Sequence, residues 1–512
     1  MSTNLTRRRT LQAAGAAALA AGLYSMTAGA ARAEDTAAGA DNSAPRLVTY
    51  PRPALVATNT SFKVRVRTAP DGEWQTLDIY LARAKQINAT TGSGPVFPSS
   101  MVYFDFQGSV ELEVTYLKGG TTKARVRPDS LGITPELLGD TLRFTLDEPK
   151  DVVVQINDEV FDCLHVITNH IDPNPPAADD PDVIYFGLGL HTVDGGILNV
   201  PSGKTVYLAG GAVLNAQVDF TEVEKASLRG SGVVQPVSRD IGSVHIHHSK
   251  NIRVEGVILL GCGLGHGMSE NTMIKKARVF TWGQWGDGFP VYCSKNVTFE
   301  GCFVRSSDDS FSIYAHRDQW YGGTSDVTIQ NTTIWADVAH PIQVGTHGNS
   351  DTPEMIENLV IKNVDILDHR EPQMDYQGCI SLNAGDSNLI KNVQVEDVRV
   401  EDFRWGQLVN MRVMFNTKYN TSAGRGIEDV YIKNLTYTGT HANSSLLLGY
   451  DADHAIKNVT FENLVVNGLV IADSMRKPRW FKTTDMVQWY ANEHVINLKF
   501  LTTAEAAAIA AS

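Results

Sequence analysis

Two patterns of apolar and polar positions divide this chain. From about residue 46 to residue 171, short runs alternate strictly between apolar and polar side chains, and turn-rich pieces separate them. Three such runs are Ser61–Val66, Val110–Val114 and Thr141–Thr145. Because successive side chains of a strand point to opposite faces, alternation is typical of strands with one buried face. The region is therefore predicted to form a small antiparallel β-sandwich.

A proline-rich and acidic segment follows the alternating region. It runs from His170 to Pro176 and continues through acidic residues to Asp182. Such a segment breaks strands and is typical of a domain junction. We therefore predict a sandwich domain with an N-terminal linker over residues 34–182 and a second domain over residues 183–512.

The second domain shows a repeated motif of the form Lys/Glu-Asn-Val-x-apolar-x-Asn/Gly. The clear copies begin at Lys250, Lys295, Glu357, Lys391, Glu428 and Lys457, and weaker copies begin near Lys204, Glu224, Glu270 and Ser325. The intervals between copies run from about twenty residues to the upper thirties. A short strand, a polar corner and a second strand at this spacing predict one turn of a parallel β-helix.

Asparagine and glycine suit the corners of such a helix because they tolerate left-handed backbone. A β-propeller is the competing repeat fold, but its blades are longer and more regular. The predicted fold is thus all-β, a right-handed parallel β-helix preceded by the sandwich. The aromatic residues after Ile471 are predicted to cap the last turn, since an open end would expose strand edges. These residues are Trp480, Phe481, Trp489 and Tyr490.

The first 33 residues have the pattern of an export signal. Thr6–Leu11 contains three consecutive arginines, an Ala/Gly/Leu run follows, and Ala31-Arg32-Ala33 provides a small-residue cleavage site. This pattern predicts a twin-arginine signal peptide over residues 1–33 and a secreted protein. A membrane anchor is the alternative, but the apolar run is short, rich in alanine and lacks a stop-transfer flank.

Charge and cysteine content exclude several classes of function. Removal of residues 1–33 takes away four arginines and no acidic residue, so the net charge changes from -13 to -17. Such an acidic surface argues against nucleic acid or an anionic membrane as the main partner. The five cysteines, too few for a disulfide scaffold, are expected to be mostly buried small hydrophobic residues. They are Cys163, Cys262, Cys293, Cys302 and Cys379.

Three aspartates stand out against the repeat. Asp287 precedes the adjacent pair Asp308 and Asp309 by twenty-one residues, which is about one predicted turn. One turn apart, the carboxylates would be separated by the strand spacing of about 4.8 Å, and at least one should then have a raised pKa. Both members of the pair can face the same side only if the chain bends or bulges there. An Asp-Asp dipeptide taken alone more often caps a turn or lies in solvent.

The surroundings of these aspartates resemble family 28 of the glycoside hydrolases, which degrade pectin. Gly286-Asp287-Gly288, Ser294–Phe299 and Asp308-Asp309 reproduce the order and spacing of that family's motifs, although Trp285-Gly286 replaces Asn-Thr. The family's later Gly-His-Gly and Arg-Ile-Lys motifs, which grip galacturonate, are missing from their usual order. Gly265-His266-Gly267 is present but precedes Asp287.

The stretch after the aspartate pair is similar to glycoside hydrolase family 49, which contains dextranases and isopullulanases. The similar segments are Asp308–Tyr314, Thr333–Trp335 and Pro341–Gly345. Family 49 also has a β-sandwich before its β-helix. The sequence departs from it at Ala339-His340, where that family tends to have Asn-Asp.

The resemblance implies an inverting hydrolysis with no metal or organic cofactor. Asp308 matches the general acid, and Asp287 and Asp309 would hold and deprotonate the attacking water. If each turn returns to register, five further polar side chains lie on the same wall and are candidates for hydrogen bonds to substrate. These are His316, Arg317, His340, Gln343 and His347. A purely structural role is at least as common for such residues.

Four tryptophans are candidates for stacking on sugar rings, because aromatic side chains pack on the apolar face of a pyranose. They are Trp282, Trp285, Trp320 and Trp335. Trp285 is the strongest candidate because it lies two residues from Asp287. Tryptophans in such positions are more often packing residues.

The sequence therefore predicts a secreted inverting glycosidase that acts on a polysaccharide or oligosaccharide. The first substrate hypothesis is a neutral α-glucan, similar to dextran or pullulan, and a galacturonan is the second. A calcium-dependent β-helical polysaccharide lyase and a non-catalytic glycan-binding β-helix are the alternatives from other classes. No nucleic acid, membrane or obligate protein partner is expected.

Overall fold

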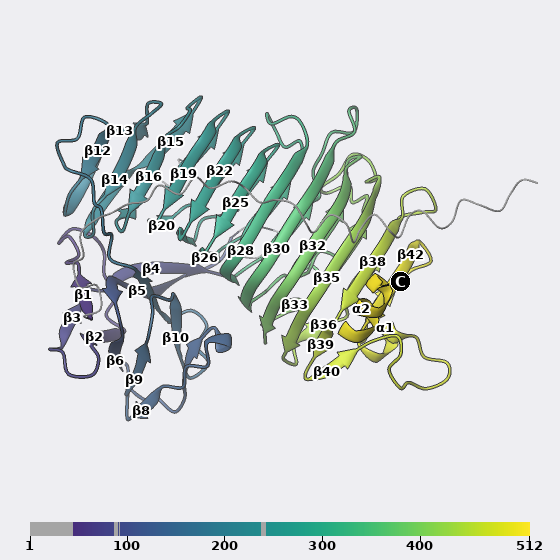
Figure 1. The fold of residues 1–512 in the computed structure, drawn as a ribbon, viewed down its shortest axis with the longest axis horizontal. Helices are drawn as coiled ribbons and strands as arrows, with labels where there is room; N and C mark the ends of the chain where they lie inside the picture. The colour runs from purple at the N-terminus through teal and green to yellow at the C-terminus, as the bar shows by residue number, and fades with distance from the viewer. Residues whose placement is uncertain (1–44, 87–90, 92, 237–241, 512) are drawn as a thin grey trace, which may run out of the picture.

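The computed structural model describes residues 45–86, 91, 93–236 and 242–511. The predicted signal peptide over residues 1–33 lies outside these residues. Among the described residues, helices are few and short, and none has the length and apolar character needed to cross a bilayer. Figure 1 shows a long stack of strands with a smaller β-domain beside its N-terminal half.

The smaller domain is a sandwich of two sheets. The first sheet contains β1 (Arg46–Thr49), β4 (Tyr80–Lys85), β5 (Val96–Gln107), β7 (Ala124–Arg127), β10 (Val152–Ile156) and β11 (Leu164–Asn169). The second contains β2 (Phe62–Thr68), β3 (Gln75–Leu77), β6 (Val110–Tyr116), β8 (Glu136–Leu138) and β9 (Thr141–Leu146). Pairing is antiparallel as predicted, except that β11 runs parallel to β5. The inner faces bury residues such as Val64, Leu112 and Phe104.

The larger domain is the predicted parallel β-helix, whose strands form three faces. The first face carries the repeated motif and consists of β12 (Val183–Phe186), β14 (Thr205–Leu208), β16 (Ser227–Gly230), β19 (Lys250–Glu255), β22 (Glu270–Lys275), β25 (Lys295–Glu300), β38 (Ile456–Glu462) and β42 (Val495–Leu501). Between β25 and β38, one long strand per turn bends from the first face onto the second. These strands are β28 (Thr324–Ala336), β30 (Met355–Asp368), β32 (Leu389–Glu401) and β35 (Gly426–Thr438).

The second face lies against the sandwich, and the third face carries the candidate site. The other strands of the second face are β17 (Val233–Val234), β20 (Ile258–Gly261), β23 (Arg278–Thr281), β26 (Phe303–Ser306) and β39 (Leu464–Val466). Those of the third face are β18 (Val244–His247), β21 (Leu264–Gly267), β24 (Phe289–Tyr292), β27 (Phe311–Tyr314), β29 (Ile342–Gly345), β31 (Ile380–Ala384), β34 (Val409–Val413), β37 (Leu446–Leu448) and β41 (Tyr490–Ala491). At the N-terminal end, β13 (Gly189–Asn199) and β15 (Ala212–Thr221) bend from the second face onto the third.

The asparagines of the repeated motif explain the regular stacking. Asn296, Asn358 and Asn392 have φ angles of 53°, 59° and 55°, in the left-handed region that asparagine tolerates. Each side chain also donates a hydrogen bond to the corresponding position of the previous turn. For example, Asn392 Nδ2 lies 2.7 Å from Asn358 Oδ1, and Asn296 Nδ2 lies 2.8 Å from Asn271 Oδ1. The motif therefore fixes both the corner geometry and the register between turns.

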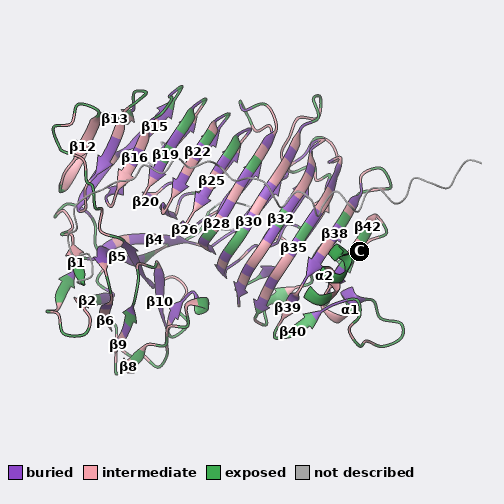
Figure 2. Cartoon of the chain, viewed as in Figure 1, coloured by how far each residue is buried: buried purple, intermediate pink, exposed green. Residues whose placement is uncertain are grey.

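Stacking produces one continuous apolar core inside the helix. Along the strands of the first face, buried residues alternate with less buried ones, as Figure 2 shows. Phe289, Phe299 and Phe311 pack with ring centroids 5.0 to 5.2 Å apart. The five cysteines are buried and form no disulfide with one another, which confirms their prediction as mostly small core residues.

A second core joins the sandwich to the second face of the helix. Apolar residues of both domains contact there, including Tyr103, Ile167 and Phe280. Arg278, only 1% exposed, crosses this interface: its Nε lies 2.7 Å from Asp151 Oδ2 and its Nη1 lies 2.6 Å from Asn169 Oδ1. The charge of Arg278 is thus paired with Asp151 inside the interface, and removal of either partner would leave a buried charge without its counter-charge.

The remaining elements lie mainly near the C-terminal end. They are η1 (Asp129–Leu131) in the sandwich, β33 (Gly406–Gln407), β36 (Ala442–Asn443), β40 (Leu469–Ile471), α1 (Thr483–Met486) and α2 (Thr503–Ala511). Trp489 is buried against Phe461 and Phe500, so it covers the end of the core as predicted. The same prediction is wrong for Trp480, which is 85% exposed. Phe481 and Tyr490 are also largely exposed.

Candidate active site

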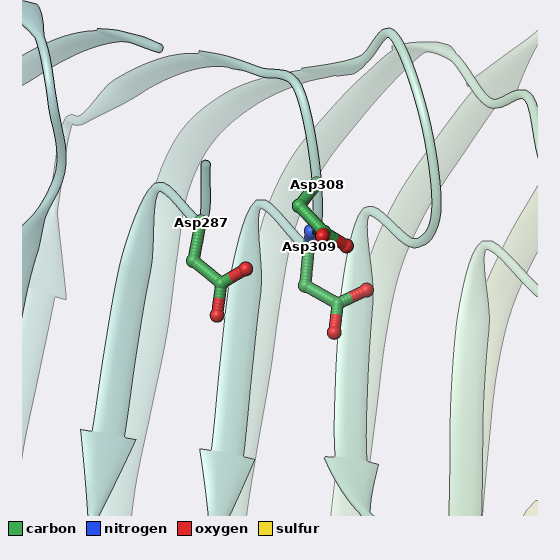
Figure 3. Close-up of side chains that lie close together, drawn as sticks. All are labelled: Asp287, Asp308 and Asp309. Carbon is green, nitrogen blue, oxygen red and sulfur yellow. Dashed lines mark hydrogen bonds between the residues drawn. The ribbon is translucent and has the colours of Figure 1, made fainter. Parts of the chain in front are cut away.

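Asp287, Asp308 and Asp309, the carboxylate cluster, lie together at the third face (Figure 3). Asp287 precedes β24 and the pair precedes β27. These strands are parallel neighbours with Phe289 opposite Phe311, so one turn separates the aspartates as the spacing predicts. One carboxylate oxygen from each residue lies within 4.8 Å of the other two. The clustering of the three side chains is thus a property of the fold.

The aspartate pair reaches one patch because it lies in a bend before β27 and not within the strand. Ser306 Oγ donates to the carbonyl oxygen of Asp308 at 2.6 Å, and the Asp309 amide donates to Asp308 Oδ1 at 3.0 Å. In a regular strand, the two side chains would point to opposite faces. The bend therefore lets both side chains face the same patch, as the prediction from the sequence requires.

Neighbouring turns hold the outer two carboxylates in place. Ser312 Oγ donates to Asp287 Oδ2 at 2.7 Å, and Tyr314 Oη donates to Asp309 Oδ2 at 2.9 Å. His340 binds Asp309 through its amide at 3.1 Å and its Nδ1 at 2.7 Å, both to Oδ1. Asp309 is only 5% exposed, and these three donors compensate for its loss of water.

Burial and crowding change the proton affinity of the cluster. Desolvation, followed by the charge of Asp309, raises the pKa of Asp287 above its ordinary value. Desolvation also raises the pKa of Asp308 well above its ordinary value, and the charges of Asp287 and Asp309 add to the effect. Three acidic groups so close cannot all ionise near neutral pH, so the cluster retains a proton. A retained proton is what a general acid needs.

The cluster is also the only group of three or more acidic, histidine or cysteine side chains with metal-binding spacing among the described residues. Four of its six carboxylate oxygens already accept hydrogen bonds from Ser312, Tyr314, His340 and the Asp309 amide. These donors favour the ionised form of the oxygens that they contact. Each oxygen keeps a further lone pair for a proton, water or substrate.

A groove of about 480 Å³ runs from the cluster toward the N-terminal turns of the third face. Its lining includes Asp287, Tyr292, His245 and His247, together with glycines of the loops on the opposite side. Gly265 of β21 lies between His245 and Pro290 in the row of outward positions and adds no side chain. The groove is thus open along the axis of the helix and ends beside the carboxylates.

Of the predicted binding residues Trp285, Arg317 and His316, Trp285 is the one in the lining of this groove. Trp285 lines it beside Asp287, and 57% of its side chain is exposed, so the position suits stacking on a sugar. Arg317 is close enough for its charge to favour ionised Asp287. The His316 amide donates to Glu354 at 2.8 Å and its ring packs on Tyr321, so the structure gives this residue a local partner.

The other three predicted binding residues are held more tightly. His340 and Gln343 are fully buried, and His340 contacts Asp309, so this geometry favours positioning roles over direct contact with substrate. His347 is partly buried, its ring meets Tyr314 edge-on at 5.2 Å, and burial lowers its pKa to about 4. His347 is therefore neutral at physiological pH. The roles of His340, Gln343 and His347 in substrate binding stay predictions.

Two of the four candidate stacking tryptophans are packing residues. Trp335 is buried between Arg127 and Arg305 in the interface with the sandwich, 4.7 and 4.4 Å from their guanidinium carbons. Trp320 is buried against His247 and His248. Trp282 faces Arg83 of the sandwich. For Trp335 the hypothesis of a sugar platform is wrong, since its indole has no open face.

Several residues of the site were not among the predicted site residues. Ser312 and Tyr314 support the cluster, and Tyr292 stacks on Tyr314 at 5.6 Å. Glu371 approaches from a loop 62 residues after Asp309, and its charge adds to the raised pKa of Asp308. The register of β24 and β27 would have indicated the tyrosine pair, because Tyr292 and Tyr314 occupy the same position of consecutive turns.

Comparison with known proteins confirms the family resemblance. Residues 270–479, which include the cluster, match the family "Glycosyl hydrolases family 28". A dextranase of Arthrobacter sp. strain CB-8 is 26% identical over 215 residues, which cover 38% of this chain and 31% of the dextranase. A probable endopolygalacturonase D of Neosartorya fischeri is 20% identical over 309 residues, which cover 58% of this chain and 57% of that protein. The matched parts thus span about a third and just over half of these relatives.

The fold also has a match among solved structures. Dex49A from Penicillium minioluteum aligns with a TM-score of 0.60 and 12% identity, over 89% of this chain and 96% of that chain. The prediction of a parallel β-helix preceded by antiparallel sheets is therefore confirmed. At this identity, the likeness concerns the fold alone.

Proposed function

We propose that this protein is a secreted, inverting glycoside hydrolase that cleaves a neutral α-glucan similar to dextran or pullulan. The observation that carries the proposal is the carboxylate cluster, which retains a proton at the end of a groove. The family 28 match over residues 270–479 supports the reaction class, because it includes all three aspartates. Export through a twin-arginine signal is part of the proposal and rests on residues 1–33 of the sequence.

Each aspartate has a separate task in this reaction. Asp308, whose pKa is raised well above its ordinary value, would deliver its proton to the oxygen of the leaving sugar. Asp309, held by Tyr314 and His340, would orient the attacking water together with Asp287 and remove its proton. The transition state carries positive charge at the sugar ring, and the ionised carboxylate stabilises that charge.

Inversion rests on the resemblance to families 28 and 49 and not on the spacing of the carboxylates. In most inverting glycosidases the two carboxyl groups are about 6.5–9.5 Å apart, which leaves room for water. Here oxygens of the cluster come within 4.8 Å of each other. The anomeric form of the first product is therefore the decisive measurement for this part of the proposal.

A neutral substrate is supported by the similarity to a dextranase, whereas the similarity to an endopolygalacturonase keeps galacturonan as the second substrate. Beyond the cluster, Gln343, Ser381 and Asn410 are uncharged but fully buried, and the next outward position of β34 is Arg412. The choice of an α-glucan therefore rests on the dextranase similarity.

The test is a glycan panel with two controls. Purified protein without residues 1–33 is incubated with dextran, pullulan and polygalacturonate while reducing ends are measured and product anomers are followed by NMR. We expect new reducing ends from dextran or pullulan, a product of inverted configuration, full activity in a chelator, and loss of activity in Asp308→Asn. Release of an unsaturated sugar that a chelator abolishes would instead identify a calcium-dependent lyase. Binding of glycan without any reducing ends would identify a non-catalytic protein.

A further inference from the structure

The accessibility of the third face changes abruptly at the carboxylate cluster. Two rows of side chains point outward from this face, because alternate residues of each strand share a side. Before the cluster, the outward residues His245, His247, Pro290 and Tyr292 are partly exposed. After it, the outward positions of one row are buried over four consecutive strands, β27, β29, β31 and β34. In one row these residues are Ser312, Gln343, Ser381 and Asn410, each with 0% exposure.

The second row shows the same change as far as β31, whereas Arg412 of β34 is partly buried. Tyr314 is 5% exposed and Asn383 is 1% exposed, whereas Tyr292, one turn earlier, lines the open groove. The residues at these buried positions are polar, so the hydrophobic effect does not explain their burial. Another part of the chain must cover them.

Two loops form this cover, which we define as residues 369–378 and 414–424. The first precedes β31 and the second follows β34. Tyr376 of the first loop meets the ring of His340 edge-on at 4.6 Å, directly beyond Asp309. Tyr419 of the second loop stacks on Tyr376 with ring centroids 4.8 Å apart. The two loops therefore join each other over the third face, beside the cluster.

Hydrogen bonds fix the cover to the helix and close its two loops onto each other. Lys418 Nζ and Tyr419 Oη donate to Gln373 Oε1 at 2.7 and 3.1 Å, which links the loops. Asp386, in the turn after β31, accepts from the Thr421 amide at 2.6 Å and from the Ser422 amide at 3.2 Å. Because these contacts are numerous and partly buried, the cover is a fixed part of the fold and not a mobile lid.

We propose that this cover makes the protein act at the end of a glycan chain. The inference rests on the proposed hydrolase function and specifies which bond of the polymer is cleaved. An internal bond can reach Asp308 only if the glycan continues on both sides of the cluster. The groove offers about 14 Å of open face from β18 to β27, at about 4.8 Å per turn, and the cover blocks the other side. The chain end must therefore lie at the cluster.

The products of wild-type protein test the inference directly. Linear dextran of uniform length is the first probe and polygalacturonate the second, and samples taken early in the reaction are analysed for product size, reducing ends and viscosity. We expect one short product from the first minutes onward and a viscosity that falls only in proportion to the bonds cleaved. An early ladder of intermediate lengths with a rapid loss of viscosity would overturn the inference while leaving the hydrolase function intact. Absence of hydrolysis on both probes and on pullulan would overturn the proposed function, and the inference with it.

A variant of the cover gives an independent test. Tyr419→Ala removes the stack on Tyr376 and one bond to Gln373, but it changes no residue of the carboxylate cluster or its direct partners. We expect at least a several-fold increase in the fraction of longer products relative to wild type. Tyr450→Ala is the matched control, because Tyr450 is 47% exposed and lies outside the cover. Equal product patterns for wild type and both variants, with long products throughout, would show that the cover does not restrict the substrate.

Discussion

Replacement of Asp308 by Asn removes one ionisable group from the carboxylate cluster and keeps the shape of the side chain. Asn retains the oxygen that accepts the Asp309 amide. In the native protein, burial and the charges of Asp287 and Asp309 raise the pKa of Asp308 well above its ordinary value. The folded protein therefore keeps a proton that the unfolded chain releases above about pH 4. Its stability falls as the pH rises above that value, because the unfolded state then binds fewer protons.

The pH sets the size of the effect. Keeping a proton on buried Asp308 costs about 1.4 kcal/mol for each pH unit above the unfolded pKa of about 4, which amounts to about 4 kcal/mol at pH 7. Asp308→Asn is thus expected to stabilise the protein by up to about 4 kcal/mol at pH 7 and to have little effect near pH 4. For a chain of this length, the unfolding entropy is on the order of 1 kcal/mol per degree, so the melting temperature at pH 7 should rise by about 4 °C. Activity should fall by about 10²–10⁴-fold, because the general acid is lost.

Differential scanning calorimetry at several pH values between 4 and 7.5 measures the change in melting temperature. The release of reducing ends measures the loss of activity. Asp326→Asn is the matched control: Asp326 is exposed, and asparagines occupy the corresponding positions, 296 and 358, of the adjacent turns. The control should melt like the wild type at every pH. If Asp308→Asn melted at or below the wild-type temperature at pH 7, the conclusion that native Asp308 keeps a proton at a cost in stability would be refuted.

Three further changes test the groove, the interface and the repeat. Trp285→Ala should raise KM by about 5–30-fold with kcat nearly unchanged, because a stacked indole contributes about 1–2 kcal/mol to binding. Steady-state kinetics measure both constants, and an unchanged KM would contradict the stacking of Trp285 on substrate. Arg278→Met leaves Asp151 buried without its partner, so it should cost about 3–5 kcal/mol, and a melting temperature within 1 °C of wild type would contradict this. Asn392→Ala places alanine at a φ of 55° and loses the bond to Asn358; it should cost about 1–3 kcal/mol. Asn392→Gly should cost less, and equal melting temperatures for the two variants would exclude the backbone as the cause.

The repeat could be predicted from the sequence because each turn contacts mainly the turns beside it. Each turn needs a residue that tolerates a left-handed corner, mostly asparagine as at Asn296 and sometimes aspartate as at Asp326, so the need leaves a periodic mark. The same period brings Asp287 next to Asp309, since their strands pair with Phe289 opposite Phe311. The spacing therefore predicted the fold class and the approach of the two turns, whereas the bend that brings Asp308 and Asp309 to one patch depends on local structure that the spacing left open.

The environment of the cluster was decided only by tertiary contacts. His340 and Glu371 reach the aspartates from later turns, across loops whose lengths differ and follow no period. The cover and the burial of Trp335 under the sandwich likewise join residues far apart in sequence. A pattern along the chain reports which side of its own strand a residue occupies, whereas such contacts depend on where unrelated segments meet in space. The sequence thus determined the repeated scaffold and its acidic patch, and the tertiary structure determined how that patch is supported and from which side it can be reached.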